Sequence, residues 1–461
     1  MKASKRELRY AQEHFNEVHH TTLNPEGPGV VRIHLIPPKI EGDEINASVA
    51  IINGQDIIPV GVSWSILLTE LIGKINVYHG QEIDPEETQQ IVRDTCAAVR
   101  KVYPFTSRKR LSEDIYRIMD TFARIAYGKP VSEDIGYMSI GDYEPFMRAP
   151  HRMDLMVSAM TKEGKWHCNQ QCIHCYAAGQ AESSEEELST KDWKAIIDKC
   201  RAVGIPQVTF TGGEPTMRDD LPELIDHAAW FVTRLNTNGV RLTKEYCRKL
   251  REASLDSAQI TFYSNDPAVH EQLTGAAHYK ETVAGIENAL EAGLNLSVNT
   301  PLCTLNANYL DTLRFLHGKG VLYVTCSGLI TTGNAALPAS ENLQLTPDEI
   351  RRILRESTEY CFENGMEISF TSPGWVEEEF FQEIGIPAPA CGACLSNMAI
   401  TPGGNVVPCQ SWLSDPVLGN FLADDWETIW NSEACKKRRS YSAAMYGECP
   451  LRRIKPDMAE R

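Results

Sequence analysis

The sequence predicts an α/β protein built around a parallel β-sheet that is covered by helices. Between about Met153 and Ala336, short β-rich runs alternate with amphipathic helical stretches. The helical pattern of Lys191–Val203 closes at Gly204, as helices commonly do. Strands joined by helical crossovers run parallel, so we expect either an open doubly wound sheet or a partial barrel.

Six strands and several helices make up this central region. The predicted strands are Asp154–Ala159, Gln207–Phe210, Thr233–Asn236, Ala258–Tyr263, Leu294–Thr300 and Leu322–Cys326. The helical stretches between them include Lys191–Val203, Thr282–Ala292 and Asn308–Gly318. In parallel α/β folds, functional groups lie at the carboxyl ends of the strands. We therefore expect the functional motifs at that edge of the sheet.

The residues before the central region predict a separate α+β domain, which we place at 1–150. Asn46–Pro59 alternates like a β-hairpin, and Asn53-Gly54 is a strong signal for its turn. Three helical stretches follow, at Trp64–Ile72, Pro85–Val102 and Ser112–Tyr127.

Three further parts complete the predicted organisation. They are the central domain at 151–338, a helical and strand linker at 339–386, and a small domain at 387–461. Within the linker, Thr346–Asn364 is predicted as one long helix with Thr346 as its N-cap. Within the last domain, Met398–Pro408 is predicted as a hairpin.

The overall charge of the chain limits its partners. It carries 45 Lys and Arg against 62 Asp and Glu, a net charge of −17. An acidic surface repels phosphate backbones and anionic lipid, so neither nucleic acid nor a membrane is expected as a partner. No apolar run approaches the roughly 18 to 20 residues of a membrane helix. The amino terminus has no apolar signal segment, so we expect a cytoplasmic protein.

The chain has 14 cysteines, and half of them fall into two groups. In a reducing compartment, clustered cysteines bind metal more often than they form disulfides. The groups are Cys168, Cys172 and Cys175, and then Cys391, Cys394, Cys409 and Cys449. Six others occur singly and are predicted as small buried hydrophobic residues: Cys96, Cys200, Cys247, Cys303, Cys326 and Cys361.

The first cysteine group has the spacing of an iron–sulfur ligand set. Three thiolates at spacings of four and three residues wrap one side of a cubane cluster, which leaves the fourth iron without a protein ligand. A substrate can chelate that iron. The alternative is structural zinc, for which His167 or His174 would supply a fourth ligand.

Two polar turns follow the next strands and point to a small ligand beside the cysteines. The second strand runs into Gly212-Gly213-Glu214-Pro215, where paired glycines let the backbone approach a ligand closely. Pro215 fixes this turn, and Glu214 can accept hydrogen bonds from an ammonium group. The third strand ends in the polar turn Asn236–Gly239 at the same rim.

Together these motifs resemble the radical S-adenosylmethionine (SAM) superfamily. The C-x3-C-x2-C triplet, the Gly-Gly-Glu-Pro turn and the Thr-Asn-Gly turn occur in that order. The resemblance implies a partial (β/α)6 TIM-like barrel, with SAM on the unligated iron of a [4Fe–4S] cluster. It also implies reductive cleavage of SAM to a 5′-deoxyadenosyl radical that abstracts hydrogen from a substrate. An electron donor such as flavodoxin or ferredoxin is then required.

The same resemblance implies roles for individual residues. Gly212–Pro215 contacts the amine of the SAM methionine, and Tyr176 lies near the adenine through its backbone. Candidates for the ribose and carboxylate are Asn238, Ser264 and Asn299, at the ends of strands three to five. The position before the third cysteine is often aromatic in the superfamily, and His174 is an acceptable variant there.

The second cysteine group resembles the SPASM/twitch extension of radical SAM enzymes, which binds auxiliary [4Fe–4S] clusters. The first cysteine, the glycine five residues before Cys409, the Leu418-Gly419-Asn420 segment and the Ile429-Trp430-Asn431 segment carry this resemblance. The dense cysteine run of the two-cluster form is absent, so we expect one auxiliary cluster. Its predicted ligands are Cys391, Cys394, Cys409 and Cys449. The alternatives are Cys435 in place of Cys449, an open three-cysteine cluster, or zinc.

The substrate class depends on the amino-terminal domain. A hairpin followed by three helices is the layout of a small winged-helix module, similar to the PqqD-like domains that capture precursor peptides by strand addition. A structural or dimerising cap is the alternative. We expect a ribosomally made peptide as substrate and partner. A small-molecule enzyme of cofactor, tetrapyrrole or carbohydrate biosynthesis is the second hypothesis, and a non-catalytic iron–sulfur or zinc sensor is the third.

Overall fold

The computed structural model describes residues 2–23, 30–78, 83–131, 135–444 and 448–452. The chain divides into two compact units, and each is described by itself. Unit 1 contains Met1–His151, Asp198–Gln207 and Trp230–Val232. Unit 2 contains Arg152–Ile197, Val208–Ala229 and Thr233–Arg461.

Unit 1 is built on a four-stranded antiparallel sheet. Its strand order is β1 (His19–Leu23), β2 (Val31–Ile36), β5 (Ser48–Ile52) and β6 (Asp56–Val60). The predicted hairpin is β5 and β6, and its turn has positive φ at both Asn53 (50°) and Gly54 (68°). Two successive residues of positive φ match the twist of the flanking strands, which explains why Asn-Gly predicts this turn. β1 and β2 were not predicted.

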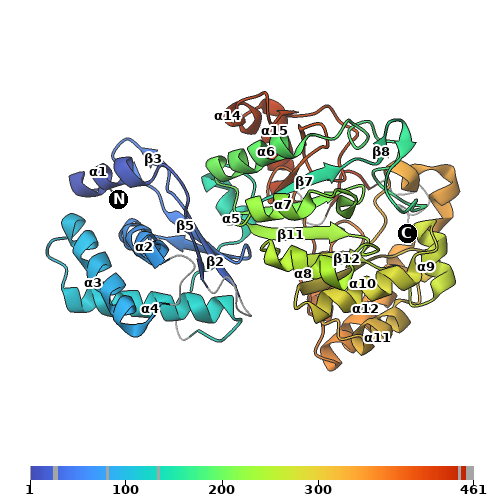
Figure 1. The fold of residues 1–461 in the computed structure, drawn as a ribbon, viewed down its shortest axis with the longest axis horizontal. Coiled ribbons are helices and arrows are strands. Elements are labelled where there is room, and N and C mark those ends of the chain that lie inside the picture. The colour runs from blue at the N-terminus through green and yellow to red at the C-terminus, as the bar shows by residue number, and fades with distance from the viewer. Residues whose placement is uncertain (1, 24–29, 79–82, 132–134, 445–447, 453–461) are drawn as a thin grey trace. The chain divides into compact units, whose positions relative to one another are not determined.

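The four longer helices of unit 1 complete its α+β character (blue to cyan in Figure 1). They are α1 (Lys5–His14), α2 (Val62–Ile75), α3 (Pro85–Val102) and α4 (Arg108–Ala126). The bounds of α3 are those predicted, because Asp84 caps its first turn and Pro85 occupies its first position. Apolar faces of α2, α3 and α4 pack with the sheet into one core, which includes Ile52, Leu68 and Ile115.

Unit 2 contains a ten-stranded sheet whose central strands are joined by helices. The order is β15-β14-β13-β12-β11-β10-β7-β16-β17-β18. Register pairs from β11 to β15 are all parallel. The strands joined by helical crossovers are β7 (Arg152–Ser158), β10 (Gln207–Gly212), β11 (Val232–Thr237), β12 (Ser257–Thr261), β13 (Asn295–Pro301), β14 (Tyr323–Ser327) and β15 (Glu367–Phe370).

The carboxyl-terminal strands extend the same sheet beyond β7. They are β16 (Asn397–Ile400), β17 (Asn405–Val407) and β18 (Gly419–Asn420). β16 lies parallel to β7, with Met398 opposite Met153, and forms the predicted hairpin with β17. The second cysteine group therefore belongs to the same sheet as the first.

Helices lie between the strands of unit 2 (green to orange in Figure 1). They are α6 (Thr190–Val203), α7 (Leu221–His227), α8 (Lys244–Glu252), α9 (Pro267–Thr274), α10 (Tyr279–Glu291), α11 (Tyr309–Gly318), α12 (Pro347–Glu363) and α13 (Glu378–Ile384). After the last strands come α14 (Trp426–Trp430) and α15 (Glu433–Ala444). Thr346 caps α12, as predicted. Among the described residues, no helix is both long and apolar enough to cross a membrane.

Candidate functional site

The loop with the first cysteine group follows β7 and a short hairpin of β8 (Thr161–Lys162) and β9 (Lys165–Trp166). Backbone bonds hold it against the end of α9. The N–H groups of Gln171 and Ile173 donate to the carbonyls of Thr274 (2.9 Å) and Leu273 (3.1 Å). Since α9 follows β12, the loop lies at the carboxyl-end edge of the parallel strands, as the sequence predicts.

The three thiols of this loop, Cys168, Cys172 and Cys175, are partly buried and form no disulfide. Burial raises the pKa of all three, that of Cys172 to about 12. A cysteine must be a thiolate to ligate iron, and the iron supplies the positive charge that a buried thiolate needs. Three partly buried sulfur donors on one anchored loop therefore fit the ligand set of a [4Fe–4S] cluster.

The glycine turn after β10 lies directly against the end of β7. The N–H of Gly213 donates to the Ser158 carbonyl at 2.7 Å. A Cβ on Gly212, whose φ is 134°, would lie 2.3 Å from the Ser158 oxygen. One on Gly213 would lie 2.7 Å from the Ala159 oxygen. Only glycine allows this approach, which brings the Gly213 carbonyl to 3.5 Å from Cys168 Sγ.

Glu214 turns its carboxylate into the protein and is 1% exposed. Oε1 accepts from the Thr216 N–H (3.1 Å) and from the hydroxyls of Thr216 and Thr237 (2.6 Å each). Oε2 accepts from the Asn238 N–H at 2.8 Å. Burial raises the pKa of Glu214, and these hydrogen bonds oppose that rise. The predicted contact with an ammonium group is thus only part of its role, since Glu214 also joins the turns after β10 and β11.

Asn238 connects the polar turn after β11 to the cysteine loop. Its Nδ2 donates to Asn169 Oδ1 at 2.6 Å, and its Oδ1 accepts from the Val240 N–H at 3.1 Å. Asn169 stands between the first two cysteines. The structure therefore brings together the cysteine loop, the Gly212–Pro215 turn and the Asn238 turn, as predicted from their order along the chain.

Ser264 and Asn299, the other two candidates for the ribose and carboxylate of SAM, make hydrogen bonds outside the cysteine loop. Ser264 Oγ accepts from the Asp266 N–H at 3.1 Å, a local bond that begins α9. Asn299 lies within β13, and its Oδ1 accepts from Thr325 Oγ1 at 2.8 Å. Thr325 also accepts from Gln259 Nε2 at 3.2 Å, so a polar row crosses β12, β13 and β14. Alternation of polar and apolar residues in these strands was the signal for this row.

Tyr176 is held by a segment that sequence reasoning missed. Its carbonyl accepts from Thr332 Oγ1 at 3.4 Å. The neighbouring Asn334 donates its N–H to the Cys175 carbonyl (2.9 Å) and its Nδ2 to the Cys172 carbonyl (3.1 Å). A Cβ on Gly333 would lie 2.4 Å from the carbonyl oxygens of both Cys175 and Tyr176. The polar Thr332-Gly333-Asn334 run after β14 was the only available signal for this support.

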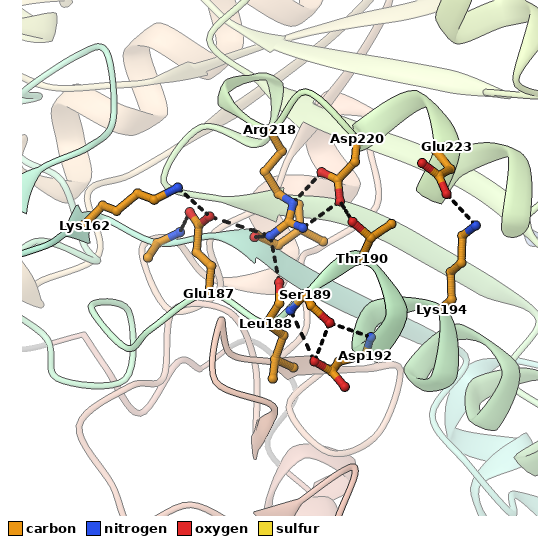
Figure 2. Close-up of polar contacts among 12 residues, drawn as sticks. Lys162, Glu187, Leu188, Ser189, Thr190, Asp192, Lys194, Arg218, Asp220 and Glu223 are labelled. Carbon is orange, nitrogen blue, oxygen red and sulfur yellow. Dashed lines mark hydrogen bonds and ion pairs between the residues drawn. The ribbon is translucent and has the colours of Figure 1, made fainter.

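Arg218, which follows the glycine turn and whose side chain is 8% exposed, makes polar contacts with several segments (Figure 2). The Nη1 of Arg218 donates to the carbonyls of Val157 and Leu188, both at 3.1 Å. Its Nε and Nη2 bind the Asp220 carboxylate at 2.9 and 2.7 Å. Glu187 lies 3.6 Å from Nη1 and accepts from the Ala159 N–H at 3.0 Å. Arg218 thus ties the end of β7 to the turn that packs on it, and no motif identified it.

Three cysteines of the second group, Cys391, Cys409 and Cys449, pack together around Ala393 and Trp412. Burial, together with the neighbouring cysteines, raises the pKa of Cys409 to about 12. As in the first group, buried sulfur donors from separate segments fit a cluster that supplies positive charge.

Cys394 and Cys435 occupy the inner side of the second group, and both are fully buried. A hydrogen bond that Cys394 donates to Cys435, together with burial, raises the pKa of the Cys394 thiol. Arg439 Nη1 lies 3.6 Å from Cys435 Sγ. Cys435, which the sequence offered only as an alternative ligand, therefore contacts one predicted ligand, whereas Cys449 packs with two others.

A cavity of about 1100 Å³, including its opening, adjoins the cysteine loop. Its lining residues are uncharged: Trp166, Gln171, Ile173, Gln272, Leu305, Asn334, Leu337, Ala339, Ser340 and Leu343. The Ser340 hydroxyl donates to the Ile173 carbonyl at 3.2 Å, which fixes one wall of the cavity to the loop.

Comparison with known proteins agrees with this geometry. Residues 167–316 match the radical SAM superfamily, and residues 391–451 match the SPASM iron–sulfur cluster-binding domain. An AdoMet-dependent heme synthase of Oleidesulfovibrio alaskensis is 30% identical over 281 residues, which cover 57% of this chain and 71% of the synthase. The chain belongs to the radical SAM superfamily. The two domain matches confirm the prediction that iron–sulfur clusters are cofactors of this chain.

Two further matches are a maturase and a solved complex with a precursor peptide. The mycofactocin maturase MftC of Mycolicibacterium smegmatis is 28% identical over 303 residues, which cover 63% of this chain and 74% of MftC. The structure of Streptococcus suis SuiB bound to its precursor peptide SuiA superposes with a TM-score of 0.58. That match covers 88% of this chain and 92% of SuiB at 13% identity. The likeness confirms the partial-barrel fold with a carboxyl-terminal SPASM domain.

The family establishes the cofactors of this enzyme. Its radical SAM domain binds SAM and a [4Fe–4S] cluster, and its SPASM domain binds auxiliary iron–sulfur clusters. The relatives include both a heme synthase and a mycofactocin maturase. The class of substrate therefore differs among the relatives.

Proposed function

We propose that this radical SAM enzyme modifies a ribosomally made precursor peptide. When bound, SAM and the reduced cluster supply one-electron cleavage of SAM and hydrogen abstraction from a substrate C–H bond. The protein orients the substrate beside the cysteine loop and excludes water from it. A crosslink, a thioether or a related change in the peptide is the expected product.

The uncharged cavity beside the cysteine loop is the observation that carries this proposal. A tetrapyrrole with propionate groups needs cationic partners when it is bound, because carboxylates are costly to bury unpaired. None of the ten residues that line the cavity is ionisable. Its apolar wall and its few amides suit a neutral side chain of a peptide.

Unit 1 supports the proposal through the outer strand of its sheet, β1. In the described part of the chain, β1 pairs only with β2, so its other edge faces away from the sheet. Such an edge is the kind of surface to which an extended peptide adds as a strand. We assign residues 1–150 to a PqqD-like peptide-binding module on this basis. The remaining parts are the core at 151–338, the linker at 339–386 and the auxiliary cluster domain at 387–461.

The residue assignments belong to the same proposal. Cys168, Cys172 and Cys175 would hold the SAM-binding cluster. The cofactor contacts would come from Tyr176, Gly212, Gly213, Glu214, Pro215, Asn238, Ser264 and Asn299. A single auxiliary cluster would take Cys391, Cys394, Cys409 and Cys449. We place the enzyme in the cytoplasm, with a flavodoxin or ferredoxin as its electron donor.

Mass spectrometry after anaerobic turnover tests the substrate class. The reconstituted enzyme is incubated with SAM and a reductant, and with either peptides encoded beside its gene or iron porphyrins. A mass change confined to a peptide supports the proposal, whereas a change confined to the porphyrin contradicts it.

A pair of leucine variants tests the cavity itself. Leu343→Arg places a cation in the cavity and is expected to raise the KM for the peptide at least tenfold. Leu322→Arg is the control, because Leu322 is exposed and lies outside the cavity. Equal KM values for the two variants would contradict the assignment of the cavity to the substrate.

A further inference from the structure

One buried tyrosine contacts the first cysteine group, and the established chemistry assigns it no role. The hydroxyl of Tyr263, two residues beyond β12, donates to Cys172 Sγ at 3.8 Å. The same hydroxyl lies 3.1 Å from Nε2 of His174. Tyr263 is 5% exposed and His174 is 8% exposed, so water does not compete for these contacts.

The position of Tyr263 is fixed from three sides. Its N–H donates to Nδ1 of His270 at 3.4 Å, and its carbonyl accepts from Asn306 Nδ2 at 2.9 Å. Its ring meets the His174 ring edge to face, with 5.0 Å between centroids. The hydroxyl is therefore held beside Cys172 before any cofactor binds.

The hydrogens of these three groups follow from their chemistry. A cysteine that ligates iron is a thiolate and only accepts, so the single hydroxyl hydrogen of Tyr263 points to Cys172 Sγ. His174 then donates Nε2–H to the Tyr263 oxygen, since that oxygen retains only lone pairs. Nδ1 of His174, which has no partner among the described residues, is left as the unprotonated nitrogen. His174 thereby polarises the tyrosine and strengthens its hydrogen bond.

We propose that Tyr263 and His174 are a positioning pair that raises the reduction potential of the SAM-binding cluster through Cys172. Reduction adds negative charge to a cluster, and a hydrogen bond to a ligand sulfur stabilises that charge. The pair exchanges no atom or electron with the cofactor. The inference rests on the proposed function only in that Cys172 is taken as a cluster ligand.

Redox titration monitored by electron paramagnetic resonance tests the pair in the full chain with its clusters. The relevant signal is the one that disappears when Cys168, Cys172 and Cys175 are replaced by Ala. Tyr263→Phe keeps the ring and removes the hydroxyl, so the ratio of reduced to oxidised cluster at a fixed potential should fall about tenfold, or ~59 mV. His174→Phe should give a smaller shift in the same direction.

The double variant, Tyr263→Phe with His174→Phe, shows whether His174 acts on the cluster through Tyr263 or independently of it. Because His174 acts through Tyr263, the double variant should shift no further than Tyr263→Phe alone. Tyr309→Phe is the control, since Tyr309 is equally buried in unit 2 and contacts no cysteine of the first group. Its potential should match that of the parent.

Three results would overturn the proposal. The first is an unchanged reduction potential in Tyr263→Phe with the cluster present. The second is additive shifts of the potential in the double variant. The third is loss of the cluster from Tyr263→Phe while His174→Phe keeps both the cluster and its potential. Continued peptide modification with an unchanged potential would reject this inference alone. A triple cysteine variant that keeps its first cluster would instead reject the ligand assignment on which the inference depends.

Discussion

Glu214 shows how a single buried side chain organises the site. Its carboxylate accepts four hydrogen bonds from residues at the ends of two neighbouring strands. Two of the donors are the buried backbone N–H groups of Thr216 and Asn238. Removing the carboxylate leaves these donors without partners, which costs more than the loss of one contact. The position of the turn beside the cysteine loop therefore depends on Glu214.

Glu214→Ala is expected to weaken SAM binding while the iron content of the protein stays constant. The loss of a charge-assisted hydrogen-bond centre costs about 1.5–3 kcal/mol, or roughly 10- to 100-fold in Kd. Anaerobic equilibrium dialysis measures the Kd. Glu223→Ala is the control, because that carboxylate is 57% exposed and pairs with Lys194 on the surface. A parental Kd in Glu214→Ala would contradict this role.

Gly212 provides a second test at the scale of one residue. Gly212→Ala drives a methyl group against the Ser158 backbone, so SAM cleavage is expected to fall more than about tenfold. Gly320→Ala is matched, because Gly320 also has positive φ (89°) but has open space around its Cβ position. The backbone strain of about 1–3 kcal/mol is common to both variants. Similar SAM cleavage in the two, measured as 5′-deoxyadenosine, would show that the close approach is unimportant.

Most elements of the structure follow from local sequence patterns, and the exceptions depend on distant partners. The six predicted strands of the core match β7 and β10 to β14 to within about two residues at their ends. β16 was predicted only as half of a hairpin. Its parallel pairing with β7 joins segments about 245 residues apart, so no local pattern reveals it. β2 was not predicted, although Val31 to Leu35 alternate between apolar and polar residues as strands commonly do.

Strand β2 also carries a pH-sensitive group of unit 1. Burial lowers the pKa of His34 from 6.5 to about 3; the nearby charges of Arg32 and His151 add to this, and the bond to the Trp230 carbonyl opposes it. Below pH 6.5 the unfolded chain binds a proton that the folded chain does not. The contribution of neutral His34 to the free energy of unfolding is therefore fully present above pH 6.5, and it is lost as the pH falls toward 3.

Thermal unfolding at pH 7.5 and pH 5 measures this effect. The parent is expected to lose about 2 kcal/mol between these values through His34, since each pKa unit corresponds to about 1.4 kcal/mol. The Tm of His34→Phe should fall less than that of the parent between pH 7.5 and pH 5. His14→Phe, at an exposed position, should behave like the parent. Equal losses in His34→Phe and the parent would rule out His34 as the sensor.

At the scale of the whole molecule, two cysteine groups share one sheet but are expected to have separate tasks. The first group lies at the carboxyl end of β7, and the second is attached through β16, the neighbour of β7. The expected task of the second cluster is to accept an electron from the substrate or to position it. SAM cleavage should not require it.

Cys391→Ala combined with Cys394→Ala tests this division. Uncoupled SAM cleavage should persist, while modified product should disappear. Circular dichroism and a retained first cluster check folding, because a cluster that ties distant segments also stabilises them. Cys326→Ala with Cys361→Ala is the control pair, since both residues are buried and belong to neither group. Product formation at the parental rate by a folded Cys391/Cys394 variant would make the second cluster purely structural.

The site was predictable where its residues form short motifs and not where they act across the fold. The cysteine triplet and the glycine turn are contiguous patterns with a chemical reason for each residue. Tyr263, Arg218 and Asn334 contact Cys172, Val157 and Cys172, which lie 91, 61 and 162 positions away along the chain. Their side chains are ordinary ones at strand ends and turns, so only the folded chain reveals their contacts.

The assignment of Cys168, Cys172 and Cys175 to the cluster that cleaves SAM is the central claim. Its most direct test measures iron and 5′-deoxyadenosine in anaerobically reconstituted protein, with the three cysteines intact or replaced by Ala. The parent should hold about eight irons, and the variant should lose about four of them together with all SAM cleavage. A triple variant that still forms 5′-deoxyadenosine would contradict the assignment.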